Sequence, residues 1–89
     1  MVVYGRLDTD RSTRLGLSVS RKVGGAVTRN RIRRRLSEAF RPLGGALPNG
    51  ANVIIVARPR IVEQSYHNME VELAGLIDKL AGALAKESK

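Results

Sequence analysis

The chain contains no cysteine and no tryptophan, and its only aromatic residues are Tyr4, Phe40 and Tyr66. Without cysteine it can hold no disulfide, zinc finger or zinc knuckle, which fits a reducing compartment such as the cytoplasm. So few aromatic residues cannot build a broad platform on which the bases of a single strand stack. Any nucleic-acid binding must therefore depend mainly on the charge and shape of the phosphate backbone.

Long hydrophobic segments are also missing. The longest apolar run, residues 53–57, is far too short to cross a bilayer, and the N-terminus lacks the basic and apolar regions of a secretory signal. An apolar fraction of 43% in 89 residues is still enough for one core. We therefore expect a single domain, residues 1–89, that does not span a membrane.

Residues suited to catalysis are scarce. The chain has one histidine, His67, and it has neither a carboxylate cluster nor a phosphate-binding fingerprint. Asp8 and Asp10 lie in the polar residues 8–14, which predict a turn with no third acid nearby. We therefore expect no catalytic residue and no metal ligand in this protein.

Positive charge is concentrated in residues 21–41, RKVGGAVTRNRIRRRLSEAFR. These residues carry eight basic groups and one acid, a net charge of +7 in a chain whose total is +8. Gathering like charges costs free energy, so the pattern indicates a polyanionic partner, nucleic acid first and an anionic membrane surface second. Arginine outnumbers lysine seven to one in this stretch, which favours forked contacts with phosphates.

Residues 26–41 are predicted to form a helix with two different faces. On a 3.6-residue wheel the apolar stripe consists of Ile32, Leu36, Ala39 and Leu43, with Phe40 beside it. The opposite face consists of Asn30, Arg31, Arg34, Ser37, Glu38 and Arg41, and the stripe is flanked by Arg33 and Arg35. Arg34 and Glu38 have the spacing of an ion pair, which would remove a little charge from this face.

Gly24 and Gly25 precede this predicted helix. Paired glycines permit a tight turn and let backbone N–H groups at a helix start approach an anion. Taken alone the pair is more often a simple turn, so the pattern is compatible with an anion site and does not establish one.

The remaining segments predict a small sheet and a second helix. Strands are expected in residues 1–7, in residues 15–20, where apolar and small polar residues alternate, and in residues 53–57, whose apolar run is typical of a buried central strand. Residues 42–50 predict a loop that ends in a Pro-Asn-Gly turn. Ser65 is expected to cap a final helix with apolar positions Met69, Leu73, Leu76, Leu80 and Leu84.

Residues 14–41, RLGLSVSRKVGGAVTRNRIRRRLSEAFR, resemble the signature of the bacterial ribonuclease P protein subunit. The matching features are the strand-type GLSVSRKVG, the A-V-x-R-N-R core at residues 26–31, the basic pair that follows and the closing E-A-F-R at residues 38–41. The later NVIIVARP resembles the family's last strand, and the leucine-rich final helix also fits. The resemblance covers essentially the whole chain.

This resemblance implies an α+β fold of one domain. It would be a two-layer α/β sandwich whose small mixed sheet contains a left-handed β-α-β crossover, as in some ribosomal proteins. It also implies a protein that does not itself cut RNA. A catalytic RNA partner would carry the active centre and bind the Mg²⁺, while the protein binds that RNA and the 5′ leader of precursor tRNA. The protein would be the non-catalytic subunit of an RNA-based endoribonuclease in the cytoplasm, with no membrane partner and no DNA partner.

By position, the resemblance assigns RNA contacts to the basic helix and to the turn before it. The residues concerned are Arg21, Lys22, Gly24, Gly25, Arg29, Asn30, Arg31, Arg33, Arg34 and Arg41. It also implies that Tyr4, Ser18 and Ser20 line a groove on the sheet that holds the leader. Judged by pattern alone, the small polar side of residues 15–20 would be an ordinary solvated sheet face.

Members of this family normally carry an N-terminal helix and a first strand before the segment matched by MVVYGRLD. We expect both to be missing here, and with them one wall of the leader groove.

Two alternatives to this function stay open. In the first, the chain is another structured-RNA-binding protein, such as a ribosomal or assembly factor. In the second, its basic helix docks on an acidic protein or anionic lipid. The absence of tryptophan makes membrane insertion unattractive.

Overall fold

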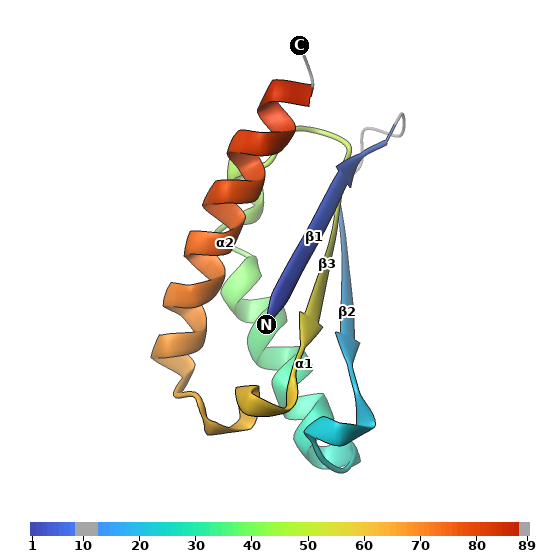
Figure 1. The fold of residues 1–89 in the computed structure, drawn as a ribbon, viewed down its shortest axis with the longest axis vertical. Helices are drawn as coiled ribbons and strands as arrows, with labels where there is room; N and C mark the ends of the chain where they lie inside the picture. Colours follow the sequence, from blue (N-terminus) through green and yellow to red (C-terminus); the bar gives the residue numbers. More distant parts are fainter. Residues whose placement is uncertain (9–12, 88–89) are drawn as a thin grey trace.

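Residues 1–8 and 13–87, which the computed structural model describes, form three strands and two α-helices (Figure 1). In chain order these are β1 (Val2–Leu7), β2 (Arg14–Val19), α1 (Ala26–Phe40), β3 (Ala51–Ala57) and α2 (Tyr66–Glu87). The connections contain the short 3-10 helices η1 (Arg21–Val23), η2 (Gly44–Ala46) and η3 (Pro59–Glu63). The predicted α+β class is confirmed. Most of the turn predicted for residues 8–14, including Asp10, lies outside the described residues.

The sheet is mixed, with β3 at its centre. β1 pairs with β3 antiparallel and β2 pairs with β3 parallel, so the strand order is β1-β3-β2. α1 therefore connects two neighbouring parallel strands. In Figure 1, β2 and β3 run downward, and the chain passes behind the sheet through α1 as it moves leftward from β2 to β3. This makes the crossover left-handed, an exception to the usual rule for such connections.

Burial alternates along β3 because the two α-helices cover only one face of the sheet. Ala51, Val53, Ile55 and Ala57 are buried against the helices, whereas Ile54 is 49% exposed on the other face. The predicted buried central strand is therefore confirmed in its position, but only one of its two faces is covered. A continuous apolar run is typical of strands with helices on two sides, but the described helices leave the second side of this sheet open (Figure 1).

The apolar stripe of α1 is the one that the helical wheel predicts. Ile32, Leu36, Ala39 and Phe40 are buried in the core between the sheet and α2. The predicted fifth position, Leu43, follows the end of the helix and is only partly buried against this core. Because the apolar and the charged residues lie on opposite sides of one rigid helix, burial of the apolar stripe makes the charged residues of α1 face outward.

The final helix begins where its cap predicts and buries a slightly different stripe. The Oγ of Ser65 accepts a hydrogen bond of 3.1 Å from the backbone N–H of Asn68. Ile77, which the sequence pattern missed, is 1% exposed. The predicted positions divide into a fully buried set, Met69, Leu73 and Leu84, and a partly buried set, Leu76 and Leu80. The buried stripe differs from the predicted one because α2 packs against both β1 and α1. The periodicity of the α2 sequence does not show which elements the helix will contact.

The predicted Pro-Asn-Gly turn leads directly into β3. The N–H of Ala51 donates to the carbonyl of Pro48 at 3.2 Å, and Gly50 has a φ of 86°. A positive φ at the third residue of a four-residue turn is a type II geometry that favours glycine. This turn thus leads the chain into the central strand.

Replacing Ile32 or Leu36 with alanine should lower the free energy of unfolding by about 2–5 kcal/mol, because each side chain is at most 2% exposed and its removal leaves a cavity. Chemical denaturation followed by circular dichroism measures the change. Val27→Ala is the matched control in the same helix, since Val27 is 83% exposed and its truncation should change stability little. Equal midpoints for all three variants would contradict the assigned stripe.

Candidate nucleic-acid interface

The outward side of α1 is a continuous basic surface. Its exposed residues include Asn30, Arg31, Arg33, Arg34 and the C-cap residue Arg41. We call these five residues the basic face of α1. Arg34 and Glu38, both described, form no ion pair, so the pairing that their spacing suggested does not reduce the charge of this face.

Arg29 differs from the other arginines of the helix. It is only partly exposed, and its Nε atom is buried without a hydrogen-bond partner among the described residues. A buried donor that lacks an acceptor costs free energy. Arg29 therefore lies at the border between the core and the basic face, and it gains hydrogen bonds if its guanidinium turns outward to an anion.

The turn before α1 presents open backbone N–H groups. Gly25 is the N-cap and provides no side-chain hydrogen bond, and the first turn of the helix contains no acidic residue. The uncapped N–H groups and the positive end of the helix dipole therefore face solvent. Gly24 has a φ of 154°, and a Cβ placed there would come within 3.0 Å of the Thr28 side chain.

A second group of cations adjoins this turn. Arg21 and Lys22 in η1 are exposed, as are Arg58 and Arg60 at η3, and η1 packs against η3. The two segments meet because they follow β2 and β3, which are parallel neighbours and so end at the same edge of the sheet (Figure 1). We call these four residues the basic edge. The sequence shows Arg58 and Arg60 after a strand, but only the strand pairing places them beside Arg21 and Lys22.

The three residues predicted to line a leader groove do not all lie together. Tyr4, which is 58% exposed, and Ser18 lie on the open face of the sheet, on opposite edge strands. Ser20 follows β2, and its Oγ accepts a hydrogen bond of 2.9 Å from the N–H of Lys22. Ser20 thus caps η1 beside the basic edge, at a distance from Tyr4 along the sheet.

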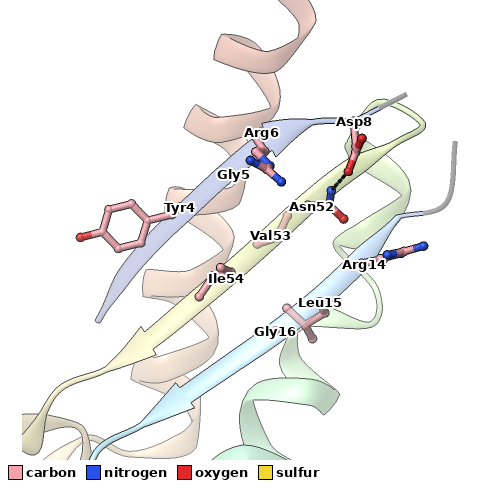
Figure 2. A pocket seen from close by; sticks show the side chains of 10 residues that line it. All are labelled: Tyr4, Gly5, Arg6, Asp8, Arg14, Leu15, Gly16, Asn52, Val53 and Ile54. Atoms are coloured by element: carbon pink, nitrogen blue, oxygen red, sulfur yellow. Dashed lines mark hydrogen bonds between the residues drawn. The ribbon is translucent and has the colours of Figure 1, made fainter. Parts of the chain in front are cut away.

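The open sheet face is hollowed at the end where β1 finishes and β2 starts. A hollow of about 510 Å³ is lined by Asp8, which follows β1, and by residues of all three strands: Tyr4, Gly5, Arg6, Arg14, Leu15, Gly16, Asn52, Val53 and Ile54 (Figure 2). We call it the sheet hollow. It includes Tyr4 but neither Ser18 nor Ser20. Because side chains alternate between the two faces of a strand, the sequence alone places Tyr4 and Arg6 on the same face. Which residues of β2 and β3 lie beside them depends on the register of strand pairing.

Two groups with shifted pKa values lie outside this surface. Burial raises the pKa of Tyr66, and the nearby carboxylates of Glu70 and Glu38 raise it further. For Glu72, burial alone would raise the pKa, but hydrogen bonds from Gln64 and from the Met1 ammonium, at 2.7 and 3.2 Å, lower it on balance. Both groups belong to the packing around α2, so neither marks an acid–base site on the basic surface.

Residues 1–8 and 13–87 contain no cluster of three or more histidine, cysteine, aspartate or glutamate residues that could hold a metal ion. His67 is exposed in the first turn of α2. None of the described helices is long and apolar enough to cross a membrane. What the described surface offers a partner is positive charge, open N–H groups and the sheet hollow.

The family model described as Ribonuclease P matches residues 1–81. The chain belongs to the ribonuclease P protein family. The ribonuclease P protein component of Thermoanaerobacter sp. (strain X514) is 46% identical over 66 residues, which are 74% of this chain and 57% of that protein. That of Oenococcus oeni (strain ATCC BAA-331 / PSU-1) is 40% identical over 76 residues, 85% of this chain and 62% of that protein. The chain thus spans less than two thirds of the length of these relatives.

Solved structures of ribonuclease P proteins share this fold. The protein from Thermotoga maritima superposes with a TM-score of 0.75 at 27% identity, covering 86% of this chain and 74% of that one. The Staphylococcus aureus protein gives a TM-score of 0.78 at 28% identity, covering 88% of this chain and 72% of that one. The family and the two-layer fold that the sequence resemblance implied are both confirmed.

Gly24→Ala should destabilise the protein by more than about 1 kcal/mol, because alanine is strained at this positive φ and its Cβ would press on Thr28. Gly75→Ala is the matched control. Gly75 lies inside α2 with nothing within 4 Å of an added Cβ, so alanine there should stabilise by about 0.5–1 kcal/mol through helix propensity. Thermal unfolding of the two variants checks the opposite signs, and a stabilised Gly24→Ala protein would contradict the turn geometry.

Proposed function

We propose that this chain acts as the protein subunit of ribonuclease P. In this proposal it binds the catalytic RNA through the basic face of α1 and binds the 5′ leader of precursor tRNA near the open sheet face. The partner RNA removes the leader by endonucleolytic cleavage. The observation that carries the proposal is a concentrated basic surface, built on one helix and the adjoining basic edge, in a chain of this family.

The surface suits a structured RNA for an electrostatic reason. The exposed arginines of α1 project from a rigid helix that is anchored by buried Ile32 and Leu36. Each guanidinium can form two parallel hydrogen bonds to a phosphate. A rigid row of such forks matches a fixed arrangement of phosphates better than a mobile tail would, because binding then costs less conformational entropy.

The uncapped start of α1 extends the same surface. Open N–H groups after Gly25 and the positive end of the helix dipole favour a phosphate there. Arg29, whose Nε lacks a partner in its buried position, lies one turn further along the helix. Binding of an anion at this point would therefore relieve an unfavourable feature of the free protein.

In this proposal the protein contributes binding and the RNA contributes the chemistry. The Mg²⁺ would be held mainly by the RNA, since the described residues cluster no carboxylates for a metal. Neutralising phosphates near the cleavage site lets the RNA hold its substrate and its metal ions at a lower ion concentration, because the protein's cations replace part of the counterion atmosphere. We expect this reaction to take place in the cytoplasm.

Reconstitution tests the proposal directly. The chain should stimulate 5′ processing of precursor tRNA by a bacterial ribonuclease P RNA at a Mg²⁺ concentration where the RNA alone is nearly inactive. The full-length Thermoanaerobacter component is the positive control for the RNA and the substrate. If that relative stimulates cleavage and this chain binds the RNA without stimulating it, the result contradicts the proposed role in 5′ processing and favours the alternative of binding another structured RNA, as a ribosomal or assembly factor does.

Arg31→Ala and Arg34→Ala should each weaken binding to the catalytic RNA. The slope of log K against log salt should also fall by about one unit for each phosphate that the protein no longer neutralises. Lys79→Ala removes an equal charge from the exposed side of α2 and serves as the control. Filter binding at several salt concentrations gives the slopes. Unchanged slopes for the arginine variants would place these side chains away from phosphates.

A further inference from the structure

Ser20 is exposed at the basic edge, outside the sheet hollow. It follows β2, and its Oγ accepts the hydrogen bond of 2.9 Å from the backbone N–H of Lys22. This bond holds the oxygen at the surface, at the start of η1. The proposed RNA contacts do not require the hydroxyl, so the structure presents an exposed nucleophilic side chain without an assigned role.

The four cations of the basic edge lie around this hydroxyl. Arg21 and Lys22 come directly after Ser20 in the chain. Arg58 lies beside it, because β2 and β3 are parallel neighbours that end opposite each other, and the residues that follow them leave the sheet side by side (Figure 1). Neighbouring strands are about 4.8 Å apart, which is within the reach of an arginine side chain. The packing of η1 against η3 adds Arg60.

None of these four cations forms an ion pair with a carboxylate of residues 1–8 or 13–87. Like charges gathered in this way repel one another, so the binding of an anion among them is favourable. In the proposed complex that anion is an RNA phosphate. A phosphate joined covalently to Ser20 would occupy the same cations first.

We propose that Ser20 is a regulatory phosphorylation site and that its phosphate blocks RNA binding at the basic edge. The inference rests on the proposed function and deepens it, because it assigns a mode of regulation to the RNA-binding surface. The enzyme that it requires is a serine kinase that uses ATP, together with a phosphatase that reverses the step.

The modification is a phosphoryl transfer. The Ser20 Oγ attacks the γ-phosphorus of ATP, so the Oγ–P bond forms as the bond from that phosphorus to the bridging oxygen of ADP breaks. A base of the kinase takes the hydroxyl proton, and ADP leaves. Hydrolysis by the phosphatase transfers the phosphoryl group to water and restores the hydroxyl.

The backbone at Ser20 suits such a reaction. Its φ of −68° and ψ of 154° are extended, and it follows a strand at the edge of the described sheet. A kinase can therefore reach the hydroxyl without unwinding an α-helix or displacing a neighbouring strand on the outer side of β2.

Phosphorylation would change the charge of the basic edge by a large fraction. A phosphoserine carries about −1.5 to −2 charges at pH 7 and adds three strong acceptor oxygens. Arg21 and Arg58 can each direct a forked pair of N–H donors to it, and the N–H of Lys22 already points at the Ser20 oxygen. A large part of the charge that attracts RNA to this edge would then be neutralised within the protein.

The test uses the 89-residue chain with phosphoserine inserted at position 20 during translation. The matched control carries phosphoserine at Ser65, which is also exposed and whose Oγ also accepts a backbone hydrogen bond, at 3.1 Å. Residues 61–78 around Ser65 contain four acids and no lysine or arginine. The two proteins therefore gain the same charge in opposite surroundings.

Phosphorus NMR of the free proteins tests the contact with the cations. The second pKa of phosphoserine is about 6, and nearby cations lower it because they favour the dianion. This pKa should be about 1 lower at position 20 than at position 65, and Arg58→Gln should raise the value at position 20. Equal pKa values at the two positions would overturn the proposal.

RNA binding tests the consequence. At physiological salt, phosphoserine at position 20 should weaken binding to the catalytic RNA, or to precursor tRNA in the assembled complex, about tenfold. The salt slope should fall by about 1–2, for one or two phosphates that the protein no longer neutralises. Phosphoserine at position 65 should have little effect, and Ser20→Glu should show part of the loss that Ser20→Gln does not. Unimpaired binding of both RNAs by the phosphorylated and Ser20→Glu proteins would overturn the proposal.

The presence of the modification in cells is measured separately. Mass spectrometry of this protein, purified from growing and from starved cells that produce it, should find phosphate on Ser20. The absence of phosphate in both states would overturn the regulatory role.

Reconstitution keeps the two proposals distinguishable, since the phosphorus titration contains no RNA. A chain that does not stimulate cleavage but loses RNA binding when Ser20 is phosphorylated would support the regulation and contradict the proposed function. A chain that stimulates cleavage equally with and without the phosphate would support the function and overturn the regulation.

Discussion

The whole arrangement depends on the burial of two helical stripes against one face of a three-stranded sheet. Leu36 of α1 and Leu73 of α2 are completely buried between the helices and the sheet. Because each helix is rigid, burying one side determines what its other side presents. The core therefore acts on function indirectly: it holds the arginines of α1 outward, and neither of the two described helices covers the second sheet face.

The concentration of charge on α1 works against stability, and the fold limits that cost. Exposed arginines are screened by water and salt, so their mutual repulsion is smaller than it would be in the interior. The acids Glu63, Glu70 and Asp78 lie on η3 and α2, so they do not belong to the basic face of α1. Positive charge is thus concentrated on one helix and the basic edge, which favours docking on a polyanion in one orientation.

Parallel pairing of β2 and β3 gathers the second half of the basic surface. Segments that follow parallel neighbours must begin at the same sheet edge, so Arg21 and Lys22 of η1 come to lie beside Arg58 and Arg60. The same pairing aligns Arg14 with Asn52 across the open face. One topological feature therefore builds both the basic edge and the polar row of the sheet hollow.

The sequence by itself determined the local features: the class of fold, the extent and buried stripe of α1, the Ser65 cap, the Gly50 turn and the family. The helix, the cap and the turn depend on interactions a few residues apart, which periodicity and turn chemistry record, whereas the fold class and the family follow from the resemblance of residues 14–41 to the family's signature. Only the tertiary structure decided that Ile54 is exposed, that Ile77 is buried, and that Arg6 and Asn52 share a row with Arg14. Each of these facts depends on strand register or on which face a distant helix covers, and such contacts leave no periodic trace in the chain.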